Sequence, residues 1–344
     1  MVEGTLARNE ARRRMAGALR PALAGLLRFG FDATVLPFTF FAIAGHFGRE
    51  AWLFDMVTFF RPHIAAMAVL LLLLAIATGS RPRMAVGAIV FVAALVPLVV
   101  PNAPAAMPAA QSDFRVMTAN VMGAQNLDFD RFRSLVAEQS PDLLVVEEVQ
   151  PAWRATVASL AGLPYSAGPE FTGGDSTTMV ASRYPIRASQ IAWRRHDPLR
   201  EGEGAIPMRI EVDRPGRRPL VVLAIHPPTP RSFDEWHARD TYLLEIAWQA
   251  QRDARTAEVI VIGDWNTPYW SPFYTRALQQ ADLRATEGAW PAPTRIFREF
   301  GAPDFLGSPI DLVAVSPSIG LVRRTVGRAF GSDHLPVIVD LAVP

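Results

Sequence analysis

The sequence predicts an all-α membrane region followed by an α+β domain in which helices lie outside packed β-sheets. Two long stretches without charge indicate the membrane region, 19 residues at 62–80 and 29 residues at 84–112. After Phe114 the chain changes to short apolar runs separated by turn residues, and predicted strands outnumber predicted helices. Half of the 344 residues are hydrophobic and 19% are charged, so the chain is more apolar than an ordinary soluble domain.

Both uncharged stretches are long enough for a transmembrane helix, because a bilayer core requires about 20 apolar residues. The other interpretation, two buried helices of a soluble protein, is disfavoured because residues 68–77 are apolar on every face. An earlier segment, Ala33–Gly48, has only 16 uncharged residues and contains a proline. This segment either spans the membrane or re-enters it, so residues 1–100 are expected to form about three transmembrane helices.

The placement of arginine predicts the orientation in the membrane. Arg81 and Arg83 lie in the loop between the last two spans, and the N-terminus carries Arg12, Arg13, Arg14 and Arg20. Arginine-rich loops and termini next to membrane spans stay on the cytoplasmic side. We therefore predict a multi-pass protein of the cytoplasmic (inner) membrane, with everything after Pro101 on the extracytoplasmic (periplasmic) side. The Pro- and Ala-rich residues 101–112 are expected to be a linker, and residues 113–344 the second domain.

The apolar runs of residues 113–344 predict the order of its strands. These strands are expected at 114–119, 143–146, 179–182, 208–212, 220–225, 259–262, 310–315 and 336–341. Helical spacing of apolar residues predicts helices at 130–139 and 233–252. About 230 residues are sufficient for one hydrophobic core.

The composition excludes several reaction classes. There is no cysteine, and every one of the 34 Lys and Arg residues is Arg. Thiol nucleophiles, cysteine-built zinc sites, Schiff-base lysines and phosphate-loop lysines are therefore excluded. Residues 1–110 carry 10 Arg against 5 acidic residues, whereas residues 111–344 carry 24 Arg against 28 acidic residues. The second part lacks the basic surplus of a general nucleic-acid clamp.

Polar residues recur where the predicted strands end. They are Asn120, Glu147, Glu148, His226, Asp264, Asn266, Asp311, Asp333 and His334. Strand ends of a layered sheet converge on one rim, so these side chains are expected to meet. Each has an ordinary alternative as a strand end, a turn residue or a helix N-cap, but their repetition favours one site. Carboxylate and amide oxygens suit Mg²⁺ or Mn²⁺, whereas zinc would favour more histidine.

This set of residues resembles the endonuclease/exonuclease/phosphatase superfamily. The motifs are Gly263-Asp264-x-Asn266 and Ser332-Asp333-His334, which are specific together and weak apart. Ile225-His226-Pro227-Pro228 and the N-terminal spans are most similar to the membrane-anchored bacterial branch called YafD-like. The resemblance covers Phe114 to Leu341. It implies a four-layer α/β/β/α sandwich, two mixed β-sheets with helices on both outer faces.

The resemblance implies a metal site and its ligands. Glu148 corresponds to the main metal ligand, and Glu147 stands where the family often has Gln and is the less expected ligand. Asn120 helps to hold the metal and to orient Asp264, and Asp333 lies close to the metal. Met122 departs from some apurinic endonucleases, which have an acidic ligand there, and this weakens an interpretation as a DNA-repair enzyme.

The resemblance also implies catalytic roles. Asp264 prepares the attacking water, Asn266 binds the phosphate, and His334, oriented by Asp311, contacts the phosphate. His226 matches the second histidine of the deoxyribonuclease-like members. These roles suit phosphodiester hydrolysis, in which a cation neutralises charge, a carboxylate accepts the proton of water and a cationic imidazole stabilises the phosphate.

The sequence therefore predicts a Mg²⁺- or Mn²⁺-dependent phosphoesterase anchored in a membrane. Its substrate is left open between nucleic acid, a lipid headgroup and a small phosphodiester. Membrane lipid is the other expected partner, and no obligate protein partner is evident. The alternative is a catalytically silent membrane-anchored binding or scaffold domain, against which the complete polar set argues. A transporter is disfavoured because the spans lack a buried charge suited to a pathway.

Overall fold

The computed structural model describes residues 2–100, 103–168, 178–191, 193, 204–288, 290–297 and 306–344, with side chains from Pro21 onward. Residues 101 and 102 of the predicted linker lie outside this described part. The chain divides into two compact units. The first consists of Met1–Phe47 and Phe60–Val99, and the second of Gly48–Phe59 and Val100–Pro344. The segment Gly48–Phe59, which lies between two apolar segments of the sequence, thus belongs to the unit that contains the sheets.

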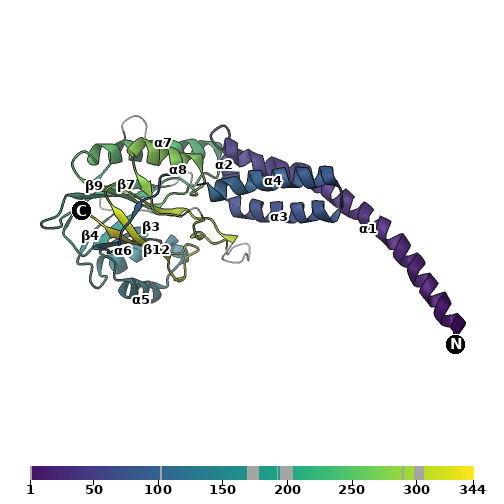
Figure 1. Ribbon diagram of the computed structural model, residues 1–344. Helices are drawn as coiled ribbons and strands as arrows, with labels where there is room; N and C mark the ends of the chain where they lie inside the picture. The colour runs from purple at the N-terminus through teal and green to yellow at the C-terminus, as the bar shows by residue number, and fades with distance from the viewer. Residues whose placement is uncertain are drawn as a thin grey trace. The chain divides into compact units, whose positions relative to one another are not determined.

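The first unit is helical (Figure 1). Its elements are α1 (Val2–Ala44), the 3-10 turn η1 (Gly45–Phe47), α3 (Arg61–Ala77) and α4 (Arg81–Val99). Helices α3 and α4 approach closely at Gly87, where a Cβ would lie 3.0 Å from the Cβ of Ala75. Small residues at such crossings are typical of membrane helices. On the exposed surface of this unit, Arg83 Nη2 lies 2.6 Å from Asp32 Oδ2.

The lengths and apolarity of these helices suit a membrane. Pro21–Phe47 and Arg81–Val99 are each long and apolar enough to cross a bilayer. The short helix α2 (Trp52–Thr58) and α3 meet at a bend of 77° and provide a third crossing if they count as one broken span. Within the described residues, two helices, or three with the bent pair, could therefore cross a membrane by their length and composition.

The second unit is built on two mixed β-sheets. One sheet has the strand order β1-β12-β13-β2-β3-β5-β4. Its strands are β1 (Met107–Pro108), β2 (Phe114–Asn120), β3 (Leu143–Glu147), β4 (Tyr165–Ala167), β5 (Met179–Ser182), β12 (Gly320–Val326) and β13 (Val337–Ala342). The other sheet has the order β10-β11-β9-β8-β7-β6. Its strands are β6 (Ile186–Gln190), β7 (Ala205–Val212), β8 (Leu220–His226), β9 (Glu258–Asp264), β10 (Arg284–Ala285) and β11 (Asp311–Val315).

The helices of this unit cover the sheets on both outer faces. They are α5 (Phe129–Gln139), α6 (Pro151–Ala158), α7 (Phe233–Asp253) and α8 (Pro272–Ala281), with the 3-10 turn η2 (Gly123–Gln125) before α5. Figure 1 shows α7 and α8 on one side of the sandwich and α5 and α6 on the other. Ser232 and Ser271 cap α7 and α8 by accepting hydrogen bonds from backbone N–H groups of the first turn.

Two apolar clusters hold these layers together. Between the sheets, Val116 and Val145 of one sheet pack with Val222, Ile260 and Val313 of the other. On the outer face of the first sheet, a second cluster joins inward-facing residues of α5 and α6 to alternate residues of β2, β3 and β5. Burial of both faces explains why β2, β3, β8 and β9 read as continuous apolar runs. The structure is a four-layer α/β/β/α sandwich, as predicted.

All eight predicted strands and both predicted helices of the second unit are confirmed within a few residues. The sequence did not predict β4, β6, β10, β12, α6 or α8. Strands β4 and β6 lie at sheet edges and are largely exposed, so they lack the apolar runs that identify buried strands. Residues 107–108 form the edge strand β1, which pairs with β12.

Candidate active site

The candidate site lies where two parallel strand pairs end. Asn120, the last residue of β2, pairs in register with Glu147 of β3. The parallel pair β8 and β9 ends at His226 and Asp264. Asp311 opens β11 directly opposite Asp264 in the antiparallel register. These ends of both sheets meet, since Asn120 Nδ2 lies 3.1 Å from Asp264 Oδ2.

Asn120 joins the carboxylates of the two sheets. Its Nδ2 donates to Glu148 Oε1 at 2.9 Å and to Asp264 Oδ2 at 3.1 Å. Its Oδ1 accepts the backbone N–H of Met122 at 2.9 Å, which fixes the amide orientation. The Asp264 side chain is 2% exposed and that of Glu148 is 36% exposed. One amide therefore holds a buried carboxylate beside a carboxylate that is open to solvent.

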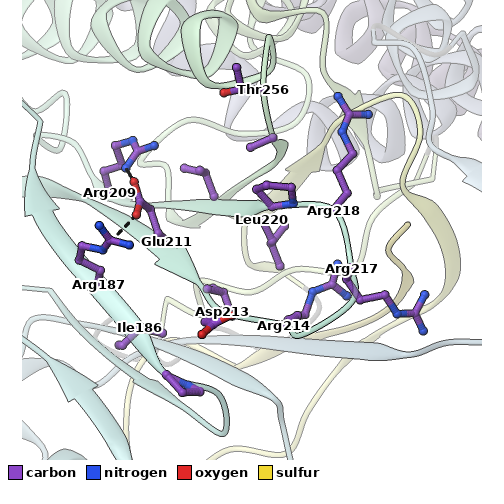
Figure 2. A pocket seen from close by; sticks show the side chains of 15 residues that line it. Ile186, Arg187, Arg209, Glu211, Asp213, Arg214, Arg217, Arg218, Leu220 and Thr256 are labelled. Atoms are coloured by element: carbon purple, nitrogen blue, oxygen red, sulfur yellow. Dashed lines mark hydrogen bonds and ion pairs between the residues drawn. The ribbon is translucent and has the colours of Figure 1, made fainter.

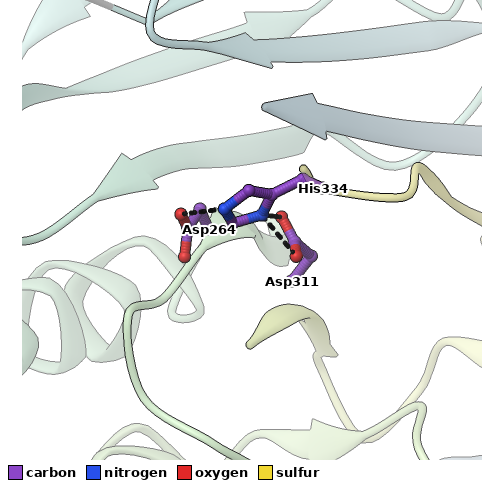
Figure 3. A group of neighbouring side chains, drawn as sticks. All are labelled: Asp264, Asp311 and His334. Carbon is purple, nitrogen blue, oxygen red and sulfur yellow. Dashed lines mark hydrogen bonds and ion pairs between the residues drawn. The ribbon is translucent and has the colours of Figure 1, made fainter. Parts of the chain in front are cut away.

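His334 forms an ion pair with Asp311 (Figure 3). Its Nδ1 lies 2.9 Å from Asp311 Oδ2 and 3.1 Å from Oδ1, and its Nε2 lies 3.7 Å from Asp264 Oδ2. Burial alone would lower the pKa of His334, but the carboxylates of Asp311 and Asp264 outweigh it and raise the pKa to about 10. The imidazole is therefore a cation at neutral pH, with Nε2 directed toward Asp264.

Asp264 is oriented by the turn that follows it. Asn266 has a left-handed backbone, with a φ of 45°, and asparagine is among the residues that tolerate this conformation. Its N–H then donates to Asp264 Oδ1 at 2.9 Å, and its Nδ2 donates to the carbonyl of Pro227 at 2.9 Å. Burial raises the pKa of Asp264, whereas the nearby His334 and His226 lower it, and the resulting pKa lies above the usual value.

His226 faces the same carboxylates. Its Nε2 lies 3.7 Å from Asp264 Oδ2 and 4.0 Å from Glu148 Oε1. The backbone N–H of His226 donates to the Tyr242 hydroxyl at 3.2 Å, and this hydroxyl donates to the carbonyl of Ala205 at 3.0 Å. Helix α7, which carries Tyr242, thus fixes the end of β8.

Asp333 differs from the other predicted site residues. Its carboxylate is 15% exposed and lies 2.8 Å from Nη2 of Arg295. The turn itself is anchored at the site, because Ser332 Oγ donates to the carbonyl of Asn120 at 2.8 Å and accepts the N–H of His334 at 3.0 Å. The structure therefore brings together seven predicted residues through mutual contacts, whereas the Asp333 side chain is paired with Arg295. The seven are Asn120, Glu148, His226, Asp264, Asn266, Asp311 and His334.

Glu147 is a further carboxyl group beneath the site. It is fully buried, and Thr118 donates to its Oε1 at 2.6 Å. Burial raises its pKa well above the usual range, more than the Thr118 hydrogen bond lowers it. Burial of Glu147 therefore disfavours its charged form.

The sequence did not identify the segment at 294–296. The hydroxyl of Thr294 accepts the N–H groups of Ile310 and Asp311 at 3.1 and 3.0 Å. Ile296 N–H donates to the carbonyl of Asp333 at 2.7 Å. This segment therefore positions Asp311 and the turn before His334 together. It lies in a Pro- and Ala-rich loop, where no apolar period or motif marks it.

The donor atoms at the site fit a small divalent cation. Ligand atoms of Asp264, Asp311 and His334 lie within 4.8 Å of one another. Nδ1 of His334 is already occupied by Asp311, and a cationic imidazole is a poor ligand. Glu148 has the exposed carboxylate next to Asp264, and its oxygens match the hard ligands that Mg²⁺ and Mn²⁺ prefer. A cation here would also neutralise the repulsion between neighbouring carboxylates.

A cavity lies at the opposite ends of strands β8 and β9 (Figure 2). It measures about 620 Å³ and is lined by five arginines, namely Arg187, Arg209, Arg214, Arg217 and Arg218. Four of them pair with carboxylates, and Arg214 donates to the carbonyl of Pro344 at 3.2 Å. Four of the five charges are thus compensated by carboxylates, and none of the predicted site residues lines this cavity, so it is not the candidate catalytic site.

Comparison with known proteins places this geometry in a family. The fold is similar to an endonuclease/exonuclease/phosphatase from Beutenbergia cavernae, with 20% identity, a TM-score of 0.53 and coverage of 68% of this chain and 72% of that one. It is also similar to the 3′ phosphatase NExo from Neisseria, with 16% identity, a TM-score of 0.51 and coverage of 67% and 100%. A humanized TDP2 from D. rerio has 14% identity, a TM-score of 0.52 and coverage of 67% and 99%. No curated protein matches the sequence.

The sequence itself provides the family assignment. A family profile described as "Endonuclease/Exonuclease/phosphatase family" matches residues 117–334. This range contains every residue of the candidate site, from Asn120 to His334. The superfamily resemblance is confirmed, and the YafD-like branch stays a prediction. The chain belongs to the endonuclease/exonuclease/phosphatase family.

Proposed function

We propose that the protein is a divalent-metal-dependent phosphoesterase, anchored in a membrane, that hydrolyses phosphodiesters with an activated water. The observation that carries this proposal is the meeting of Glu148, Asp264 and the His334–Asp311 pair at one rim. Two sheets contribute these groups, and the hydrogen bonds at this rim join residues 23 to 144 positions apart. A domain that only binds or scaffolds has no need for this arrangement.

Glu148 would hold the cation, which is Mg²⁺ or Mn²⁺ by the chemistry of the donors. Asn120 orients Glu148 and Asp264 through its amide nitrogen, and Asp333 is the further carboxylate proposed for the metal. When bound, the metal ion would polarise the phosphoryl group and offset its negative charge. This proposal requires Asp333 to exchange its contact with Arg295 for the ion.

The remaining residues bind and position the reacting groups. Asp264, buried and fixed by the N–H of Asn266, is placed to accept a proton from the attacking water. His334 is cationic and presents Nε2 toward Asp264, so it can donate to a phosphate oxygen as charge develops. The Asn266 amide and His226 lie beside these groups and are proposed to bind the phosphate.

The connectivity of the chain supports the proposed topology. Gly48–Phe59 and Val100–Pro344 form one unit, so they occupy the same side of a membrane. An even number of crossings must then lie between them, which α3 and α4 provide. With Arg81 and Arg83 cytoplasmic, Gly48–Phe59 and the catalytic domain lie outside the cytoplasm. Because the N-terminal arginines are also expected in the cytoplasm, the first apolar segment then crosses the membrane as well.

The full-length protein in detergent tests the proposed activity. We expect hydrolysis of bis(p-nitrophenyl) phosphate that requires Mg²⁺ or Mn²⁺ and is abolished by EDTA. His334→Ala and Asp264→Asn should each lower kcat/KM roughly a hundredfold or more, because each removes a group that stabilises the transition state. His237→Ala and Asp282→Asn, which alter exposed residues of the same types, should retain activity. Full activity in EDTA would contradict the metal requirement.

A substrate panel then separates the proposed classes. Single- and double-stranded DNA, RNA, phospholipid vesicles and small phosphodiesters are compared at equal metal concentration. A rate of hydrolysis more than tenfold higher for one class than for the others identifies the class of substrate. Absence of hydrolysis on the whole panel, with the protein folded and metal present, would favour the silent scaffold alternative.

A further inference from the structure

The short segment Gly48–Phe59 is integrated into the catalytic unit. Its helix α2 buries Asp55, Val57 and Thr58. Trp52 Nε1 donates to the carbonyl of Pro230 at 2.8 Å, and Gly48 packs closely on the ring of Pro272. These contacts reach the loop before α7 and the first residue of α8. The segment is therefore more than a connection between two apolar helices.

The central contact is a buried ion pair between Asp55 and Arg239 of α7. Asp55 Oδ2 contacts Arg239 Nη2, and both side chains are 0% exposed. The other carboxylate oxygen, Oδ1, accepts the hydroxyl of Ser271 at 2.8 Å. The guanidinium also lies 5.0 Å from the ring centre of Phe273. Asp55 thus neutralises a buried cation that α7 and α8 enclose.

Arg239 extends this contact to the candidate active site. Its Nη1 donates to the backbone carbonyl of Asn266 at 3.2 Å. Asn266 is the left-handed residue whose N–H fixes Asp264 Oδ1 at 2.9 Å. One continuous chain of contacts therefore runs from Asp55 through Arg239 and Asn266 to Asp264, across 184 positions of sequence between its first two members.

We propose that Asp55 is a positioning residue for catalysis, acting through Arg239 to hold the Asn266 turn and the carboxylate of Asp264. The effect on turnover rests on the proposed phosphodiesterase function. The effect on the geometry of the turn does not, because it follows from the hydrogen bonds alone. The segment Gly48–Phe59 accordingly helps to position the carboxylate of Asp264 in the catalytic domain.

A double-mutant cycle in the full-length protein tests the coupling to the site. We expect Asp55→Ala to lower kcat/KM for bis(p-nitrophenyl) phosphate about tenfold to a hundredfold, because small displacements of a catalytic group are costly. The combination with Asn266→Ala should lie within about twofold of Asn266→Ala alone, since both disturb the same turn. Additive losses would overturn the proposal.

Asp253→Ala is the matched control. Asp253 also lies in a partly buried ion pair, which joins α7 to Arg209 of β7 at 2.9 Å. This pair does not touch the Asn266 turn. The variant should keep kcat/KM within about twofold of the wild type, and its loss should add to that of Asn266→Ala. A loss equal to that of Asp55→Ala would overturn the specific role of Asp55.

A second variant separates positioning from stability. Asp55→Ala leaves a buried guanidinium without its carboxylate and should lower Tm by roughly 10 °C. In Asp55→Ala/Arg239→Met both charges are absent, so Tm should recover by at least half. The hydrogen bond to the Asn266 carbonyl is still missing, so kcat/KM should stay low. Recovery of activity together with Tm would show that the pair is structural only, and would overturn the proposal.

Hydrogen–deuterium exchange provides a readout that needs no activity. Asp55→Ala should raise the exchange of the peptide containing residues 264–267 at least tenfold, whereas Asp253→Ala should leave it unchanged. If the exchange rises but the wild type hydrolyses no phosphodiester, the proposed function fails and the positioning contact stands. If the wild type is active and the exchange is unchanged, the positioning role is refuted.

Discussion

The charge of His334 is set by its neighbours. Its imidazole is buried, yet the carboxylates of Asp311 and Asp264 raise its pKa from 6.5 to about 10. The cation therefore stabilises the folded protein fully below pH 6.5, and this contribution is lost as the pH rises toward 10. At neutral pH the site thus contains one fixed positive charge among its carboxylates, suited to an anionic phosphate.

Replacement of Asp311 tests this charge. Asp311→Asn removes the carboxylate that raises the pKa of His334 most, so this pKa should fall. We expect the alkaline limb of the pH profile of kcat/KM, measured with Mg²⁺, to move at least about one pH unit lower. Asp282→Asn, at an exposed carboxylate, should keep the wild-type profile. An alkaline limb that does not move in Asp311→Asn would contradict the role of this ion pair.

Several site residues could be predicted because they follow strands. Asn120, His226 and Asp264 each end an apolar run, and a local pattern is enough to find them. Arg295 and Thr294 follow no strand and take part in the site through contacts across the fold. The side-chain pairing of Asp333 with Arg295 is also a non-local contact, so no local pattern indicates it.

At the end of β9, the close approach of strand β8 requires glycine at position 263. Gly263 has a φ of 146°, and a Cβ at this position would overlap the carbonyl oxygen of Ile225 in the neighbouring strand β8. It would also lie 3.0 Å from Oε1 of Glu147. Only glycine allows β8 and β9 to come this close at the point where Asp264 enters the site.

Gly263→Ala should accordingly destabilise the sandwich. We expect a loss of about 3 kcal/mol in the free energy of unfolding, from backbone strain and the overlap with a rigid backbone atom. Gly288→Ala is the control, because a Cβ there meets no atom within 4 Å, and it should change stability by less than about 0.5 kcal/mol. Thermal unfolding of the two variants measures both values. Equal stability of the two would show that the strand end adapts.

The buried strands and the long amphipathic helix were predictable because each buries a continuous set of residues. Strands β2, β3, β8 and β9 are buried along their length, and α7 repeats its apolar residues at helical spacing. Strand β12 carries the exposed Arg323 on one face and Arg324, which pairs with Glu287, on the other, so no apolar run identifies it. Pairing with β13 determines its structure, and pairing partners far apart in the chain cannot be read from local composition.

Across the whole chain, the membrane topology depends on non-local contacts as well as on hydropathy. Hydropathy identifies the apolar segments because it depends only on neighbouring residues. It does not reveal that Gly48–Phe59 belongs to the unit of the sheets, since that depends on contacts such as Asp55 with Arg239. This membership favours the spanning interpretation of the first apolar segment over the re-entrant one.

Reporter fusions test the resulting topology. Alkaline phosphatase fused after Pro344 or after Phe59 should be active, because both positions are expected outside the cytoplasm. A fluorescent protein that folds only in the cytosol should fluoresce when fused after Ser80, next to Arg81 and Arg83. Fluorescence of that reporter after Pro344 would refute the proposed orientation. Inactive phosphatase after Phe59 together with active phosphatase after Pro344 would contradict the placement of Gly48–Phe59 on the same side as the catalytic domain.

The position of Asp55 has a consequence for how such a protein can be regulated. Many ectodomains are shed by proteolysis near the membrane and remain functional in solution. A cut between residues 103 and 112 would here release a fragment without Asp55, in which Arg239 keeps its place beneath the Asn266 turn but loses its counter-ion. By the positioning role proposed for Asp55, shedding would therefore lower the proposed activity, as Asp55→Ala is expected to do.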